Sequence, residues 1–298
     1  MIEPNFTPPF SQWEHIHFIG KINLNLEQPR LYRYEYYSRF KKMFLKKNII
    51  FPSPLSWPDL FEQRFLSNSF LKYCFGYKKD FKNLRNDIFA LCYTGDGTEN
   101  ADAQWNTRNP KRKDFCIKYS INLWKMLDYL NLLSDNIFNG KIEFYISSIS
   151  YEYSQEELIQ NQHIRAIGKP SGDNRVPYLI RTMSYKRKAF KYENEIRIWA
   201  VLKEDNPLSE KNNHILTLEN FDWKKIDLQI QVAPYKSILA FDKFKKLKDY
   251  NQAKRINEKN IQQERTTKIL NELRLLKKEI NVSHLYNIPV WKCSKDLK

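Results

Sequence analysis

Residues 194–202 read NEIRIWAVL, a stretch that alternates polar and apolar residues at its start and is wholly apolar at its end. This pattern predicts a β-strand. Residues 88–94, IFALCYT, form a continuous apolar run of strand length and predict a strand that is buried on both faces. An opening strand is predicted at residues 30–36, RLYRYEY.

The other elements follow at irregular intervals along the chain. Further strands are predicted at residues 48–51, 114–119, 141–151, 237–241 and 284–291, and helices at residues 38–47, 61–75, 121–133 and 243–280. Such an order does not repeat the strand–helix unit of a doubly wound parallel sheet, so we expect a compact α+β domain. This domain is expected to span residues 29–242. Residues 1–28 are interpreted as an N-terminal extension, and residues 243–298 as a basic helix and final strand packed on the same domain.

Composition excludes several other classes of protein. The chain has 298 residues, of which 42% are hydrophobic and 15% aromatic, a composition that excludes intrinsic disorder. No apolar run approaches the roughly 18 to 20 residues of a membrane helix, and the N-terminus lacks the layout of a signal peptide. We therefore expect a cytoplasmic protein with no membrane partner. Its four cysteines show no CxxC spacing, so neither a disulfide framework nor a zinc ribbon is predicted.

The net charge is strongly positive. Fifty Lys and Arg residues against 34 Asp and Glu residues give +16, which would attract nucleic acid, a polyanionic cofactor or an acidic protein. Residues 241–298 hold 15 basic and 7 acidic side chains, an excess of +8. The alternative interpretation is a solvated, lysine-rich helix with no partner.

A pair of acids marks the segment most suited to chemistry. Glu193 and Glu195 are two residues apart where a strand begins, so the pleat is expected to point both carboxylates to one face. They follow a basic run that includes Lys186, Arg187 and Lys188 and is suited to holding a phosphate-bearing ligand. The alternative is an edge strand whose exposed face is merely polar.

These residues also resemble a known enzyme superfamily. Phe190, Glu193 and Glu195 reproduce the aromatic-x-x-(Glu/Gln)-x-Glu turn of ADP-ribosyltransferases, which recognises the target and delivers the catalytic glutamate on the following strand. Residues 31–34, LYRY, resemble the opening strand of that superfamily, in which an aromatic residue precedes an Arg or His that binds NAD.

A set of short motifs in the same order resembles one bacterial family in particular, a domain of unknown function. Its members carry LYKY, FSSP-x-x-FNDPFE, CFS, MWxxY and KxxxWxxExExR. The corresponding residues here are LYRY at 31–34, FPSP at 51–54, Phe61-Glu62, Cys92-Tyr93-Thr94, Trp105, and Lys186 with Phe190, Glu193, Glu195 and Arg197. The resemblance covers most of residues 30–200.

The chain departs from that family at two motifs and from the superfamily at a third. Trp57-Pro58-Asp59 stands where the family has Asn-Asp-Pro, and Arg108 ends the motif that begins at Trp105 where the family has Tyr. The Ser-Thr-Ser triplet of the superfamily is not present as such, and Ser53 and Ser56 are the nearest candidates.

The resemblance implies an ADP-ribosyltransferase-like fold with a split mixed sheet, and a reaction that uses NAD as substrate without a metal. Glu195 would stabilise the oxocarbenium-like transition state. Glu193 would orient or deprotonate the acceptor. The residues implied to bind NAD are Arg33, Tyr34, Ser53 and Trp105, although Tyr34 and Trp105 can equally be core residues.

The resemblance further implies a biological setting. Phe190, Lys186, Arg187 and Lys188 would contact the acceptor, and the net charge favours nucleic acid in that role, RNA over DNA. Intracellular transferases of this superfamily include toxins of toxin–antitoxin and anti-phage systems. An antitoxin or other neutralising protein is therefore an expected partner.

The sequence is also compatible with two other functions. A noncatalytic nucleic-acid-binding protein would use the basic helix and exposed aromatic residues without NAD. A metal-dependent nuclease would use Pro58-Asp59 with Asp80 and Lys82, although the sequence around Asp80 lacks the alternation of a buried strand. His15 and His17 could together bind a metal, but a structural role is the favoured interpretation.

Overall fold

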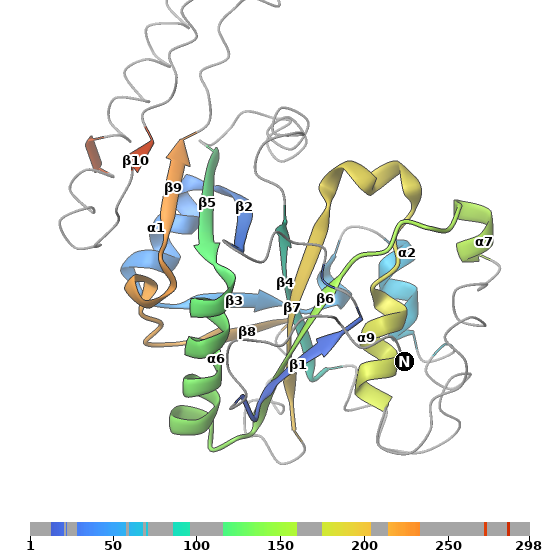
Figure 1. Cartoon of the computed structure of the whole chain (residues 1–298), viewed down its shortest axis with the longest axis horizontal. Coiled ribbons are helices and arrows are strands. Elements are labelled where there is room, and N and C mark those ends of the chain that lie inside the picture. The colour runs from blue at the N-terminus through green and yellow to red at the C-terminus, as the bar shows by residue number, and fades with distance from the viewer. Residues whose placement is uncertain are drawn as a thin grey trace, which may run out of the picture.

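The structure, a computed structural model, is a mixed α+β fold (Figure 1), as the order of the elements predicts. It describes residues 13–20, 22, 29–57, 60–67, 70, 86–95, 116–159, 175–203, 214–232, 271–272 and 285–286.

Within these residues, eight strands form one mixed sheet in the order β1-β6-β7-β4-β2-β5-β9-β10. They are β1 (Ile16–Ile19), β2 (Arg30–Tyr36), β4 (Ile88–Thr94), β5 (Cys116–Asn122), β6 (Ile142–Ser148), β7 (Glu195–Leu202), β9 (Gln229–Val232) and β10 (Leu285–Tyr286). The outermost pairs, β1 with β6 and β9 with β10, are parallel, and the other neighbours are antiparallel. A separate antiparallel pair joins β3 (Ile49–Pro52) to β8 (Ile215–Leu218).

Helices cover both faces of the large sheet. The described α-helices are α1 (Tyr37–Leu45), α2 (Leu60–Gln63), α6 (Leu123–Phe138), α7 (Gln155–Ile159) and α9 (Arg175–Met183), and the 3-10 helices are η1 (Pro54–Ser56), η2 (Arg64–Leu66), η3 (Lys188–Glu193) and η4 (Trp223–Ile226). Residues of α1 and α6 pack into one apolar core, and residues of η2 and α9 pack into another. None of the described helices has the length and apolar character needed to cross a membrane.

Strand β7 separates the two cores. All of its residues are buried, and the side chains alternate between the cores because successive residues of a strand point to opposite faces. Ile196, Ile198 and Ala200 enter the core that contains α6, whereas Trp199 and Val201 enter the core that contains α9. The apolar run that predicts this strand is therefore explained by burial on both faces.

The large sheet has a weak junction in its middle. Strands β2 and β4 are paired at one position, where Tyr32 lies opposite Thr94. By contrast, β2 is paired with β5 along its whole length, from Arg30 to Tyr36. The sheet therefore consists of two laddered parts, β1-β6-β7-β4 and β2-β5-β9-β10, that meet at a single pair of residues.

Several predicted elements are confirmed, and others were not anticipated. The strands predicted at residues 30–36 and 88–94 have these bounds in the structure. Strand β1 lies in the segment interpreted as an N-terminal extension, and neither β8 nor β9 was predicted. The strand at 237–241 and, apart from Asn271 and Glu272, the helix at 243–280 lie outside the described residues.

The packing of β6 gives a stability prediction. Phe144 on β6 is fully buried, and its ring centroid lies 6.1 Å from that of Phe51 on β3. We expect Phe144→Ala to lower the free energy of unfolding by about 3–5 kcal/mol, because it removes buried apolar surface and leaves a cavity. Leu132→Ala on α6 is the control, since Leu132 is 49% exposed. Urea denaturation measures both, and equal effects would contradict the assignment of Phe144 to the core.

Candidate active site

The two acids singled out by the sequence lie on different elements. Glu193 is the last residue of η3, and Glu195 is the first residue of β7. Asn194 between them has a left-handed backbone with a φ of 38°, a conformation that Asn adopts more readily than most residues. The alternation of one strand, which was expected to align the carboxylates, is therefore not what brings them together.

A lysine brings them together instead. The Nζ atom of Lys186 lies 2.5 Å from Oε2 of Glu193 and 3.2 Å from Oε2 of Glu195. The two oxygens are therefore at most 5.7 Å apart, the sum of these distances. At an effective dielectric constant of about 20, two such charges repel by about 3 kcal/mol. The ammonium between the carboxylates offsets this repulsion.

The basic run thus divides into inward and outward residues. Lys186, which was expected to contact the acceptor, is buried, and its ammonium faces the two carboxylates. Arg187 is half-buried, with its Cζ 4.8 Å from the centroid of the Phe190 ring. Lys188 and Lys191 are exposed.

Arg197 holds Glu195 from the other side. Its Nε donates a hydrogen bond of 2.6 Å to Oε1 of Glu195, and its Nη2 donates to Oε1 of Glu62. Its Nη1 donates to the carbonyl oxygen of Met183 at 2.8 Å. The guanidinium carbon lies 4.3 Å from the ring centroid of Trp57, a cation–π contact in an environment without solvent.

The charges of this cluster set its protonation. Burial alone would raise the pKa of Glu195, but the charges of Arg197 and Lys186 hold it well below its usual range. Burial would lower the pKa of Lys186, yet the surrounding glutamates, Glu195 first, raise it. Burial and the charge of Glu195 raise the pKa of the Cys92 thiol to about 12. Glu195 is therefore ionised, and Cys92 is a neutral thiol beside it.

The backbone of Glu195 is also fixed. Its N–H donates to the hydroxyl of Tyr151 at 3.1 Å, and its carbonyl oxygen accepts from the N–H of Ile149 at 2.9 Å. Burial, together with the charge of Glu195, raises the pKa of Tyr151 well above its usual range. Sequence reasoning missed Tyr151, because nothing local marks a tyrosine that follows a strand as part of a site.

Arg33 lies on the other side of the sheet from the glutamate. Tyr32 is opposite Thr94, and Thr94 is opposite Glu195, so these three residues share one face. Arg33 follows Tyr32 and therefore points to the opposite face, where its cross-strand partner is Tyr119.

The contacts of Arg33 agree with this placement. Its Nη1 donates to the carbonyl oxygen of Cys92 at 3.3 Å, and its Nη2 pairs with Oε2 of Glu35 at 3.4 Å. Its guanidinium carbon lies 6.0 Å from the centroid of the Tyr93 ring. The side chain thus occupies the place where β2 and β4 separate, and it does not join the glutamate pair.

The other residues expected to bind NAD are placed as follows. Tyr34 is buried, and because it alternates with Arg33 it lies on the face that carries Glu195. Ser53 is buried and accepts a hydrogen bond from the N–H of Leu55, so it caps the turn η1. Trp105 lies outside the described residues, as do Asp59, Asp80 and Lys82 of the nuclease alternative.

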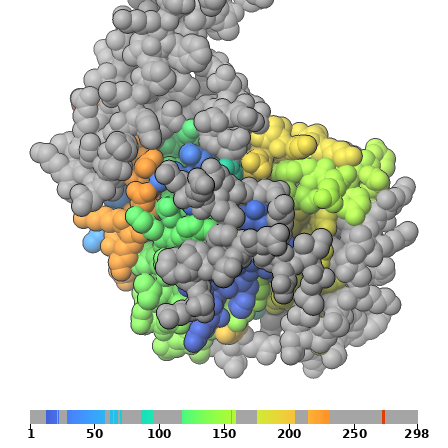
Figure 2. Space-filling view, in the orientation of Figure 1, coloured from blue at the N-terminus to red at the C-terminus, as the bar shows by residue number. Residues whose placement is uncertain are grey.

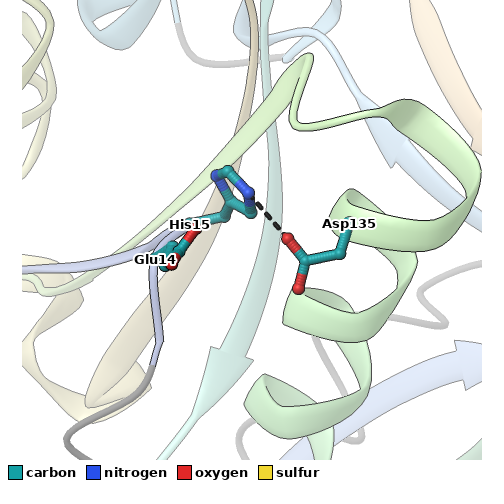
Figure 3. A group of neighbouring side chains, drawn as sticks. All are labelled: Glu14, His15 and Asp135. Atoms are coloured by element: carbon teal, nitrogen blue, oxygen red, sulfur yellow. Dashed lines mark ion pairs between the residues drawn. The ribbon is translucent and has the colours of Figure 1, made fainter.

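One group among the described residues has the spacing of metal ligands. The ligand atoms of Glu14, His15 and Asp135 lie within 4.8 Å of one another (Figure 3). His15 Nε2 is 2.8 Å from Asp135 Oδ1, an ion pair that ties the segment before β1 to α6 when the histidine is protonated. His17 is not part of this group: its Nε2 lies 3.8 Å from Oε2 of Glu143, and its ring stacks on Tyr145 with centroids 4.7 Å apart. The described contacts are those of a structural link between elements.

Comparisons with known proteins give no further identification, since no family model, curated protein or solved structure matches the chain.

The buried charges around Arg197 generate a second stability prediction. Arg197→Met leaves Glu62 and Glu195 without their shared cation, and we expect the free energy of unfolding to fall by about 3–5 kcal/mol. Arg181→Met on α9 is the matched control, because Arg181 is exposed. Chemical denaturation measures both variants. A loss below about 1 kcal/mol for Arg197→Met, the range of an exposed ion pair, would show that the cluster does not hold these elements together.

Proposed function

We propose that the protein is an NAD-dependent mono-ADP-ribosyltransferase that acts in the bacterial cytoplasm. The observation that carries this proposal is the convergence of motifs that are far apart in the sequence. Glu62, Cys92, Lys186, Glu195 and Arg197 belong to motifs of the resembling family, and their side chains interact in one buried cluster. A chance resemblance between short motifs gives no reason for them to meet.

The state of Glu195 supports its role toward NAD. A carboxylate has about four lone-pair positions, of which Arg197 and Lys186 use one on each oxygen and the Cys92 thiol uses a third. An ionised Glu195 can therefore still accept a hydrogen bond from a ribose hydroxyl. In the reaction, the bond between C1′ of the ribose and the nicotinamide nitrogen breaks, and its electron pair leaves with nicotinamide. The fixed negative charge stabilises the positive charge that develops on the ribose.

Glu193 is assigned to the acceptor. Its side chain is more exposed than that of Glu195, at 18% against 7%, so it is the more accessible of the two carboxylates. A nucleophilic atom of the acceptor forms the new bond to C1′, and Glu193 takes the proton that this atom loses. Tyr34, on the same face as Glu195, is the aromatic residue we assign to the NAD pocket. The contacts of Arg33 support a role in the fold instead.

The fold supports the same proposal. The single pair between β2 and β4 divides the large sheet in two, and a split mixed sheet is what the resemblance implies. A neutralising protein is the proposed protein partner. Nucleic acid, RNA before DNA, is the proposed acceptor because of the net charge of +16.

The role of Glu195 is tested by Glu195→Gln. The amide keeps the shape of the side chain but loses the charge, so we expect NAD turnover to fall by about 100- to 1000-fold. Glu156→Gln on α7 is the control, since Glu156 is exposed. Release of nicotinamide measures turnover, and circular dichroism checks the fold. A folded Glu195→Gln protein with activity within about threefold of the parent would remove Glu195 from the mechanism.

The acceptor is tested on the surface beside the glutamates. Figure 2 shows the α7 segment (lime) next to part of residues 175–203 (yellow) at the surface. The pKa of Glu157 on α7 is lowered by hydrogen bonds with Ser154 and, to a smaller extent, by the charge of Lys188. Lys188 and Lys191 both belong to η3, and they offer exposed positive charge there.

With labelled NAD and separate RNA, DNA and protein pools, we expect the label in RNA. The double change Lys188→Glu and Lys191→Glu should reduce RNA labelling more than NAD hydrolysis, because a phosphate backbone loses contacts that the small substrate does not need. Each lost phosphate contact should lower the slope of log affinity against log salt by about 0.7. Label confined to protein would contradict a nucleic-acid acceptor.

A further inference from the structure

Lys186 is held in place through its backbone. Its N–H donates to the carbonyl oxygen of Ser150 at 3.0 Å, and the N–H of Ser150 donates to the carbonyl oxygen of Ser184 at 2.8 Å. Ser150 and Tyr185 form a parallel β-bridge just beyond the end of β6. The α-carbon of Lys186 is therefore attached to the same sheet that carries Glu195, and its position does not depend on the charges at the end of the side chain.

The side chain is equally constrained. Lys186 is 8% exposed, and its Nζ lies 4.9 Å from the centroid of the Phe190 ring. An ammonium has three donors, and Lys186 directs donors to Glu193 and to Glu195. Phe190 thus covers a cation that bridges the two carboxylates.

Other charged and titratable groups surround this bridge on several elements. Arg197 binds Oε1 of Glu195, whereas Lys186 binds Oε2, so the two cations hold different oxygens of one carboxylate. The remaining groups that act on the bridge are Glu62 on α2, Cys92 on β4 and Tyr151 after β6.

We propose that Lys186 is a positioning residue, whose ammonium keeps the Glu193 and Glu195 carboxylates close together while both are charged. This inference rests on the proposed function, because the pair it holds is the one that acts on NAD and on the acceptor. Without Lys186, the repulsion between the carboxylates is relieved by separation together with uptake of a proton, and each of these removes a group that the reaction needs.

The first test is the pH profile of NAD turnover in the full chain. For Lys186→Met we expect kcat at neutral pH to fall by about 100-fold, the effect of a misplaced reacting group. We also expect the acidic limb of the profile to move up by about one to three pH units, because the pair now keeps a proton to higher pH. Lys186→Arg, which keeps the charge, should return the acidic limb toward that of the parent. Lys125→Met on α6 is the control, since Lys125 is exposed and remote from β7 in the sequence.

The second test does not depend on catalysis. In the parent, Glu195 stays ionised between pH 5 and 8 because its pKa lies well below its usual range. In Lys186→Met, the folded pair holds a proton in this range, whereas a glutamate in the unfolded chain, with a pKa of about 4.3, is ionised. The free energy of unfolding of the variant should therefore fall as pH rises from 5 to 8. Its stability deficit, the difference from the free energy of unfolding of the parent, widens over this range. The deficit of Lys125→Met should not change with pH.

A double variant covers the case in which Lys186→Met does not fold. Adding Glu193→Gln removes one of the two repelling charges, so Lys186→Met with Glu193→Gln should regain folded protein and lose the pH dependence of the deficit. Failure of this rescue, or a deficit that is constant from pH 5 to 8, would overturn the proposal for Lys186 whether or not the protein turns over NAD. An unchanged acidic limb in an active Lys186→Met enzyme would overturn it too. A different result would refute the proposed function but keep the role of Lys186 in holding the carboxylates. In that case the stability deficit of Lys186→Met widens with pH, but the parent protein never releases nicotinamide from NAD.

Discussion

The bridge that Arg197 makes between Glu62 and Glu195 is the interaction on which the rest of the site depends. A guanidinium with 1% exposure needs partners for its charge and its donors, and here two carboxylates and a backbone carbonyl supply them. These partners lie on α2, on β7 and at the end of α9. The requirement to satisfy one buried cation therefore fixes three elements relative to one another, and it fixes the orientation of Glu195 as a consequence.

The central strands of the fold can be predicted from the sequence, but the short strands β1, β8 and β9 cannot. The strands at 30–36 and 88–94 could be predicted because aromatic and apolar runs of that length are typical of β-strands. Strand β1 has four residues, IHFI, and its pairing partner is β6, which lies more than 100 residues later in the chain. A pattern within these four residues therefore does not show that they form a strand. Strands β8 and β9 have four residues each, so alternation cannot be distinguished from chance in them.

Some features of the site can likewise be predicted from the local sequence, whereas others depend on contacts between distant segments. The glutamates could be found because their spacing and neighbours form a motif, and their closeness is confirmed by their contacts with Lys186. The inward direction of Lys186 could not be predicted, since a basic run on its own suggests a solvated face. The face on which Arg33 lies depends on the register of β2 against β4, which is set by a single pair and leaves no trace in either strand. A local sequence pattern can therefore suggest which residues belong to the site, but contacts between distant segments determine where their side chains lie.

The pairing of β3 with β8 has a consequence for how the chain folds during synthesis. Ile49 on β3 is paired with Leu218 on β8, and both are fully buried or nearly so. The partner of an early strand is therefore made only after most of the protein has left the ribosome. Contacts of such high sequence separation slow folding, and the edge of β3 that pairs with β8 stays without that partner in the meantime. Until the C-terminal half of the chain arrives, this edge offers unpaired backbone groups to which a strand of another chain could add.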